Sequence, residues 1–340
     1  MQATSTPRGK KRLSIVTPCF NEEAGLVEFH RRVTLVCSAA AGASYEIVLI
    51  NDGSTDGTLD GLMALAAADP HVVVLDLARN YGHQIALSAG LELCTGERIL
   101  ILDADLQDPP ELLAQMMEEM DRGADVVLGQ RRTRQGESWF KINSARAFYR
   151  LLQQLVDVKL AMDTGDFRLM SRRALDHLNA MPERYRFIRG MVSWLGLRQT
   201  AILYDRDPRF AGETHYPLRK MIALALDAVT SFSVVPLRLA SHLGFFMGLM
   251  GIFALIYTVA SWATGHAVPG WTSLAVLVLI IGSGQFLVLG IFGEYLGRMY
   301  METKRRPLYI INQIHASPAV EASGEDARGL QENLKQVLRA

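Results

Sequence analysis

The segment from Asp103 to Asp108, with the sequence DADLQD, carries the strongest chemical signal in this 340-residue chain. It follows a short apolar run and precedes the residues PPE, a combination typical of the start of a helix. Two carboxylates this close together at a strand end can both reach a shared crevice, and their oxygens suit Mg²⁺ or Mn²⁺ bound together with a diphosphate. The alternative is a capping and turn cluster, since aspartate is common before helices.

Two further polar segments follow apolar runs nearer the N-terminus. The first is PCFNEE at residues 18–23, and the second is NDGSTDG at residues 51–57. A carboxylate at a strand end can accept hydrogen bonds from a base or a ribose, and glycine lets the backbone approach a flat base closely. Each segment alone also fits an ordinary loop, the second as an Asp-Gly turn with Ser54 or Thr55 capping a helix.

These polar segments lie between strand-like and helix-like patterns that alternate along the chain. Short apolar runs at residues 13–17, 46–51, 72–76, 98–103 and 125–129 alternate with helical periodicity at residues 26–40, 59–67, 84–93 and 110–121. The alternation predicts an α/β fold with a mostly parallel sheet and helices on both faces. Because ligands bind at the carboxyl ends of the strands in such a sheet, we expect the polar segments to share one crevice.

Beyond residue 230 the composition becomes strongly apolar. Residues 243–263 and 272–293 carry no charged side chain, and each run can cross a hydrocarbon core of about 30 Å at about 1.5 Å per residue. The connector at residues 265–270 has no Lys or Arg, whereas Arg238 and the segment 298–306 are basic. The positive-inside rule then predicts two transmembrane helices with the α/β domain and both termini in the cytosol. A buried helical hairpin in a soluble core is the alternative.

These patterns predict five parts in the chain. They are an N-terminal tail (1–12), the α/β domain (13–215), an interfacial amphipathic helix (216–235), the transmembrane hairpin (236–300) and a cytosolic C-terminal tail (301–340), poorly ordered after Pro318. A helix of the soluble core is the alternative for residues 216–235. The basic N-terminus lacks the apolar core of a signal peptide.

Charge and cysteine content exclude some classes of protein. Lys plus Arg and Asp plus Glu both number 35, so no global charge excess favours nucleic acid as a partner. Cys19, Cys37 and Cys94 form no CxxC pair, which fits reduced thiols in the cytosol.

In combination these features resemble the family 2 inverting glycosyltransferases of GT-A fold. They are most similar to the membrane-anchored polyprenyl-phosphate glycosyltransferases, which include dolichyl-phosphate mannose synthase and bacterial polyprenyl-phosphate glucosyltransferases. The matching motifs span about residues 13–230 and are PCFNEE, NDGSTDGT, residues 79–91, DADLQDPPE, Gly129 with Arg131, GDFRL at residues 165–169, residues 186–190 with Trp194, and Arg209 with GETHYPLRKM. So long a series of matches makes chance a remote explanation.

The resemblance implies the roles of particular residues. Nucleotide contacts are expected from Pro18, Phe20, Asn21, Glu22, Asp52, Ser54, Arg79, Asp103 and Ala104. A Mg²⁺ or Mn²⁺ cofactor is expected at Asp103, Asp105 and Gln107, phosphate contacts at Arg131, Arg209 and His215, and catalytic roles for Asp105, Arg131 and Asp166.

Two positions depart from the family pattern. Asn51 stands where relatives often have the first of two aspartates, so Asp52 is expected to carry the contact. His215 stands where many relatives have lysine, which makes phosphate binding there dependent on pH.

The implied reaction is transfer of a sugar from a nucleotide-sugar donor to a polyprenyl phosphate acceptor, of undecaprenyl or dolichyl type, in the lipid bilayer. A phosphate monoester has a second pKa of about 6 and is largely dianionic in the cytosol, so it needs little help from a base. We therefore expect a single in-line displacement with inversion at the anomeric carbon. Asp166 is the carboxylate expected near the attacking oxygen, and the alternative is that it anchors Arg168.

Several alternatives stay open at this stage. UDP-glucose is the first choice of donor, ahead of GDP-mannose, UDP-GlcNAc and UDP-linked amino sugars. A processive polysaccharide synthase would usually show a QxxRW box and more membrane spans, and this sequence shows neither. A non-catalytic sugar-binding scaffold would not need the acidic pair of Asp103 and Asp105. Relatives also imply a homo-oligomer in a bacterial inner membrane.

Overall fold

The computed structural model describes residues 11–132, 164–205, 233, 235–264 and 270–316. They fall into two compact units. An α/β unit comprises the described residues before 206 and after 305, and a helical unit lies between them in the sequence. The expected amphipathic helix at residues 216–235, apart from Ser233 and Val235, lies outside the described residues, as do residues 265–269 of the connector and the tail from residue 317.

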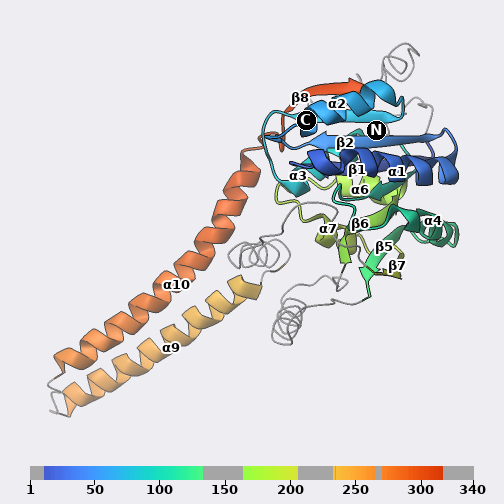
Figure 1. Ribbon diagram of the computed structural model, residues 1–340. Coiled ribbons are helices and arrows are strands. Elements are labelled where there is room, and N and C mark those ends of the chain that lie inside the picture. The colour runs from blue at the N-terminus through green and yellow to red at the C-terminus, as the bar shows by residue number, and fades with distance from the viewer. Residues whose placement is uncertain (1–10, 133–163, 206–232, 234, 265–269, 317–340) are drawn as a thin grey trace, which may run out of the picture. The chain divides into compact units, whose positions relative to one another are not determined.

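The α/β unit is built on an eight-stranded sheet (Figure 1). In spatial order the strands are β7 (Gln199–Tyr204), β5 (Val126–Arg131), β6 (Thr164–Ser171), β4 (Arg98–Ile101), β1 (Leu13–Cys19), β2 (Tyr45–Asn51), β3 (Val72–Leu77) and β8 (Ile311–Ala316). The four neighbours β4, β1, β2 and β3 are parallel, and so are β5 and β7. β6 runs antiparallel to β4 and β5, and β8 runs antiparallel to β3. The sheet is mixed and mostly parallel, as the sequence predicted.

Helices cover both faces of this sheet. One face carries α1 (Leu26–Ala41), α2 (Thr58–Ala68) and α4 (Leu113–Asp121), and the other carries α3 (His83–Leu93), α6 (Arg172–Asn179) and α7 (Ile188–Trp194). Short 3-10 turns at Glu23–Gly25 and Pro110–Leu112 precede α1 and α4. Because both faces are covered, every residue of β1, β2 and β3 is buried, which explains why Val, Ile and Leu occupy adjacent positions in these strands.

The position of α3 is set by close packing on β1 and β2. A Cβ atom at Gly90 would lie 2.5 Å from Ile50 Cδ1 and 2.6 Å from Val16 Cγ1, so only glycine lets the helix come this near the strands. The first residue of α3, His83, thereby lies next to the carboxyl ends of the strands.

Some boundaries differ from the expected ones. The strand expected at 98–103 ends at Ile101, because the chain turns there to present Asp103, and the helix expected from Pro110 begins with a 3-10 turn. The sequence patterns did not reveal β7 or β8. β8 belongs to the region expected to be a tail, and it completes the edge of the sheet beside β3.

The helical unit contains two long helices, α9 (Val235–Ala263) and α10 (Trp271–Thr303). Both are long and apolar enough to cross a membrane. They extend beyond the uncharged runs at residues 243–263 and 272–293, because a charged side chain does not end a helix.

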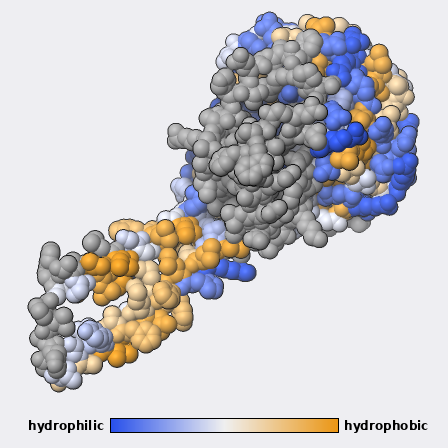
Figure 2. Space-filling model, turned by 60° about the horizontal axis from the view of Figure 1, so that its bottom comes forward, coloured by the Kyte–Doolittle hydropathy of each residue, from blue (hydrophilic) through white to orange (hydrophobic). Residues whose placement is uncertain are grey.

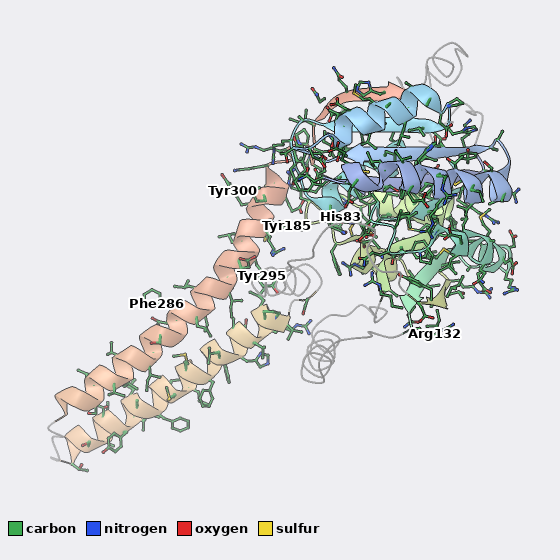
Figure 3. All side chains as sticks on the ribbon, in the orientation of Figure 1. His83, Arg132, Tyr185, Phe286, Tyr295 and Tyr300 are labelled. Atoms are coloured by element: carbon green, nitrogen blue, oxygen red, sulfur yellow. The ribbon has the colours of Figure 1, made fainter. Side chains whose placement is uncertain are left out.

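The two helices pack on each other and expose apolar side chains elsewhere (Figure 2). A Cβ atom at Gly284 would overlap the Met247 side chain, and Tyr295 donates a hydrogen bond from its hydroxyl to the carbonyl of Ser233 at 2.6 Å. Phe286 is 78% exposed and projects away from α9 (Figure 3). The most apolar stretches of both helices are unburied in the part of the chain that is described, which does not fit a hairpin inside a soluble core.

Candidate active site

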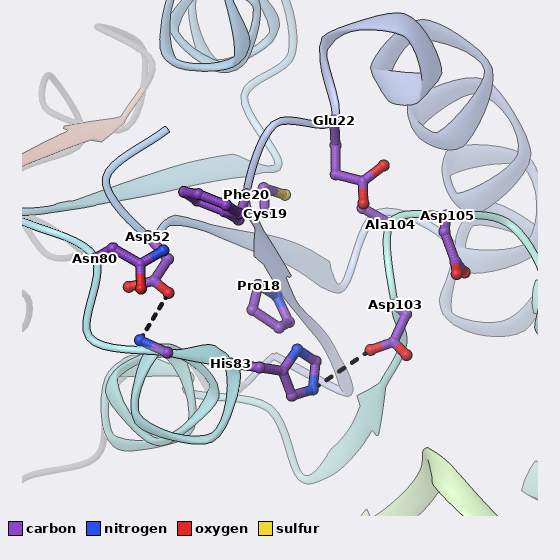
Figure 4. Close-up of a pocket in the computed structure, with 11 residues that line it drawn as sticks. Pro18, Cys19, Phe20, Glu22, Asp52, Asn80, His83, Asp103, Ala104 and Asp105 are labelled. Atoms are coloured by element: carbon purple, nitrogen blue, oxygen red, sulfur yellow. Dashed lines mark hydrogen bonds and ion pairs between the residues drawn. The ribbon is translucent and has the colours of Figure 1, made fainter. Parts of the chain in front are cut away.

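An open pocket of about 240 Å³ lies at the carboxyl ends of β1, β2 and β4 (Figure 4). The chain runs from β1 outward to β2 and β3 and then returns to β4 on the other side of β1, so the pocket lies at the point where the strand order reverses. The lining residues are Pro18, Cys19, Phe20, Glu22, Asp52, Asn80, Gly82, His83, Asp103, Ala104 and Asp105. The polar segments after three strands therefore share one crevice.

Asp52 fixes the segment that precedes α3. Its carboxylate accepts the backbone N–H of Tyr81 at 2.7 Å. It also accepts the backbone N–H of Gly82 at 2.9 Å (Figure 4). Burial raises the pKa of Asp52 above its ordinary value, although these two hydrogen bonds oppose the shift. The neighbouring Phe20 is 46% exposed, so an aromatic face is available at the pocket for a flat base.

Gly53 makes this arrangement possible. Its φ of +65° lies in the left-handed region, and a Cβ there would lie 2.4 Å from Asn80 N. The loop after β2 therefore packs directly against the backbone that leads into α3.

Three residues expected at the nucleotide lie outside the pocket lining. Asn21 donates its N–H to Ser54 Oγ at 3.1 Å and accepts the N–H of Thr55 at 2.8 Å, so these residues join the loops after β1 and β2. Asn21 has φ 57°, a conformation that asparagine tolerates. The guanidinium of Arg79 lies 4.1 Å from the centre of the Tyr81 ring and donates to the carbonyl of Asn80.

The acidic pair follows β4. Asp103 and Asp105 both line the pocket, and Asp105 Oδ1 accepts the backbone N–H of Gln107 at 3.1 Å. Gln107, expected as a third metal ligand, lies outside the pocket lining. Leu106, between Asp105 and Gln107, has φ 56°, a left-handed conformation that is unusual for leucine.

The environment of Asp103 fits a bound cation. Its Oδ1 is buried and accepts no hydrogen bond from a described residue. Desolvation and the nearby carboxylates of Asp166, Asp108 and Asp105 raise its pKa to about 6, against the opposing charge of His83. No group of three or more acidic, His or Cys side chains in the described ranges could hold a metal alone. Two carboxylates sharing the cation with a ligand phosphate are the usual arrangement for Mg²⁺.

His83 is a pocket residue that the motifs did not single out. Its Nε2 lies 3.6 Å from Asp103 Oδ1 (Figure 4). The same nitrogen lies 3.1 Å from Asp166 Oδ2. Burial disfavours its charge, but the hydrogen bond to Asp166 and the charges of both carboxylates raise its pKa to about 9. The available signals were its place inside the matching stretch at residues 79–91 and its position directly after a glycine, one residue before the helix expected at 84–93.

Asp166 on β6 lies behind His83 and does not itself line the pocket. Gln84 Nε2 donates to its Oδ2 at 3.0 Å, Arg189 Nε lies 3.2 Å from Oδ1, and Arg168 Nη2 lies 3.7 Å from Oδ1. Burial favours the neutral acid, yet these partners and His83 hold the pKa of Asp166 far below its usual range. Asp166 is therefore an anion that is hydrogen-bonded to His83 and Gln84 and also lies near the guanidinium groups of Arg189 and Arg168, so Arg168 is only one of several partners.

The expected phosphate-binding residues are placed elsewhere or not described. Arg131 does not line the pocket, and its Nε lies 3.4 Å from the Tyr204 hydroxyl and its Nη2 3.7 Å from Asp108 Oδ1. Arg209 and His215 lie outside the described residues.

An open, mostly parallel sheet with an acidic pair after β4, at the reversal of strand order, is the arrangement of a GT-A glycosyltransferase domain. The family profile "Glycosyl transferase family 2" matches residues 14–178. The uncharacterized glycosyltransferase YkcC of Bacillus subtilis is 44% identical over 303 residues, which cover 88% of this chain and 93% of YkcC. The bactoprenol glucosyl transferase of Shigella phage SfX is 39% identical over 304 residues, covering 88% of this chain and 98% of the phage protein.

Among solved structures, the crystal structure of S. aureus TarS 1–349 in complex with UDP-GlcNAc matches with a TM-score of 0.46 and 16% identity. It covers 65% of this chain and 66% of that one. The similarity over nearly the full length of the sequence relatives decides the classification. The chain belongs to glycosyltransferase family 2, and it is a glycosyltransferase.

Proposed function

We propose that this enzyme transfers glucose from UDP-glucose to a polyprenyl phosphate at the cytosolic face of a bacterial inner membrane. The observation that carries the proposal is the pocket that joins Phe20 and Asp52 to Asp103 and Asp105, in a chain similar along most of its length to bactoprenol glucosyl transferases. The relatives' names supply the sugar and the lipid.

The pocket residues suit a nucleotide-sugar. Phe20 offers a ring for stacking on the base, and Asp52 lies where it can accept from the base or ribose while holding the backbone before α3. Asp103 and Asp105 would hold a Mg²⁺ or Mn²⁺ ion, which when bound offsets the charge of the diphosphate and stabilises it as it leaves. His83 adds a positive charge at the same end of the pocket.

The chemistry of the acceptor limits what the protein must do. An oxygen of the lipid phosphate dianion forms a bond to the anomeric carbon, and the bond from that carbon to the UDP oxygen breaks, giving UDP and an inverted phosphodiester. Four negative charges enter with the two substrates and four leave with the products, so no proton has to be removed. The residues therefore bring two anions together and orient them. Asp166 acts by orienting His83 and Arg189 rather than as an obligatory base.

The two long helices are consistent with an acceptor that resides in the bilayer. α9 and α10 would cross the membrane with the α/β unit and both termini on the cytosolic side, as the basic flanks at Arg238 and residues 304–306 predict. From the resemblance to the polyprenyl-phosphate glycosyltransferases, we also expect the enzyme to assemble as a homo-oligomer.

The test is transfer by the purified full chain in lipid nanodiscs. Undecaprenyl phosphate and Mg²⁺ are supplied with radiolabelled UDP-glucose, GDP-mannose, UDP-GlcNAc or a UDP-linked amino sugar in turn. We expect label from UDP-glucose in the lipid fraction, together with release of UDP. No label should enter the lipid fraction when undecaprenol replaces undecaprenyl phosphate. Transfer from another donor would correct the sugar, whereas no lipid product from any donor would refute the proposed reaction.

A further inference from the structure

A chain of hydrogen bonds connects the segment after α10 to the wall of the donor pocket. Asn312 of β8 donates from Nδ2 to Asp76 Oδ2 at 2.7 Å, and Asn51 donates from Nδ2 to Asp76 Oδ1 at 2.7 Å. Asp76 on β3 is only 5% exposed. A buried carboxylate thus bridges the last strand of the chain and the end of β2.

The bridge fixes how the loop after β2 is held. A carboxylate only accepts hydrogen bonds, so both amide side chains must present their nitrogen to Asp76. The Oδ1 of Asn51 is then turned to accept the backbone N–H of Ser54 at 3.2 Å. Ser54 Oγ in turn accepts the N–H of Asn21, which lies between two pocket residues in the sequence. The orientation set at Asp76 is therefore passed to both loops of the pocket wall.

A second contact ties the same segment to α3. Tyr309 is buried, and its hydroxyl donates to Glu92 Oε2 at 2.6 Å. The carbonyl of Ile310 accepts the N–H of Ala78 at 2.9 Å, beside the loop that leads to Gly82. The segment after the second long helix therefore supports the pocket at β3 as well as at α3.

We infer that Asn312 and Asp76 are positioning residues for nucleotide binding, so that the strand following the second long helix is part of the support of the donor site. Both act through Asn51, whose displacement would move Asp52 away from the backbone N–H groups that it holds. This inference rests on the proposed function, because it assigns the two residues a role in binding the donor.

The test exchanges the donor and acceptor of one hydrogen bond. Asn312→Asp places a second carboxylate against Asp76, and we expect Kd for UDP with Mg²⁺ and KM for UDP-glucose to rise about tenfold, or about 1.4 kcal/mol. KM for undecaprenyl phosphate should stay the same. With Asp76→Asn added, the amide nitrogen at position 76 can donate to the new carboxylate at position 312, and the amide oxygen can still accept from Asn51. Kd and KM of the double variant should therefore return to within about threefold of the wild-type values.

The control is Ala67→Asp, which adds the same charge at an exposed position of α2 that takes no part in these contacts and should leave UDP binding unchanged. If Asn312→Asp does not fold, Asn312→Ala replaces it, with an expected rise in Kd of about threefold that Asp76→Asn cannot reverse. Unchanged Kd in Asn312→Asp, or no recovery in the double variant, would overturn the inference. GDP binding and the transferase activity of the wild type are measured in parallel. If the wild type binds GDP in place of UDP, or transfers no sugar, the result counts against the proposed function and not against this inference.

Discussion

The two walls of the pocket hold their polar groups in opposite ways. On the wall formed after β1 and β2, polar side chains are matched with backbone groups or with each other, as Asp52 is with the N–H groups of Tyr81 and Gly82. On the wall formed after β4, one oxygen of Asp103 is buried without a hydrogen bond from the described part of the chain, and so is one oxygen of Asp166, which lies behind this wall. Charged groups gather there within 4 Å of one another.

Under the proposed function, this difference would separate donor recognition from reaction. The first wall is fixed before any ligand arrives, which suits a neutral base and ribose that need a preformed shape. The second wall has the negative charges of its carboxylates and the positive charge of His83, and under the proposed function a cation and a diphosphate would complete its electrostatics. Substitutions in the second wall should therefore mainly lower kcat, and those in the first should mainly raise donor KM.

The largest effect is expected from Asp103→Ala. Loss of this carboxylate removes a ligand of the cation that stabilises the leaving diphosphate, and turnover should fall by at least about 10³-fold while the protein stays folded and membrane-bound. Asp105→Ala should behave in the same way. The measurement is glucose transfer to undecaprenyl phosphate, with Asp60→Ala on the exposed surface of α2 as the control. Near-normal turnover of either site variant would refute the role of the acidic pair.

Asp166→Asn is expected to have the next largest effect. It keeps the shape of the side chain but removes the charge that His83, Arg189 and Arg168 share, so kcat should fall by about 10²-fold with donor KM within about threefold. Steady-state kinetics in both substrates measures the split. A rise in donor KM with unchanged kcat would place Asp166 on the recognition side and contradict the division between the walls.

Asp52→Ala tests the recognition wall. It leaves the N–H groups of Tyr81 and Gly82 without their acceptor, at a cost of about 1–3 kcal/mol, so donor KM should rise by about 10- to 100-fold. The value of kcat should change much less. Titration of the variant with UDP measures the loss of donor binding independently. A loss of kcat at saturating donor would show that the two walls do not act separately.

The smallest effect is expected from Phe20→Ala. Stacking of a ring on a base contributes about 0.5–1.5 kcal/mol, so donor KM should rise by about tenfold or less, and Phe20→Tyr should restore it. If both variants bind UDP as wild type does, the ring does not contact the base.

The sequence predicted the central strands and their helices because their apolar periodicity is local and strong. The runs expected at 46–51 and 72–76 became β2 and β3 almost unchanged, and seven residues expected at the nucleotide or the metal line the pocket, namely Pro18, Phe20, Glu22, Asp52, Asp103, Ala104 and Asp105. Their positions follow from one rule, the convergence of parallel strand ends. Their roles stay predictions.

What the sequence did not reveal depends on long-range pairing. β8 is a short edge strand with a mixed pattern, and it pairs with a strand more than 200 positions earlier, so no local signal marks it. His83 lies inside the matching stretch at residues 79–91 without an assigned role, and its contact with Asp166, 83 positions later, is revealed only by the structure. Asn21 and Ser54 are expected to contact the ligand because they lie within ligand motifs, and this stays a prediction; the structure adds that their side chains join the two loops, a contact that the motifs do not encode.

The most direct test of the acidic pair is the binding of Mn²⁺ in the presence of UDP, followed by electron paramagnetic resonance on the full chain in nanodiscs. For the wild type we expect the free Mn²⁺ signal to fall on addition of UDP beyond what UDP alone causes, and we expect Asp103→Ala and Asp105→Ala to abolish that additional binding. Equal Mn²⁺ and UDP binding by wild type and both variants would contradict the claim that these two carboxylates hold a cation together with the diphosphate of the donor.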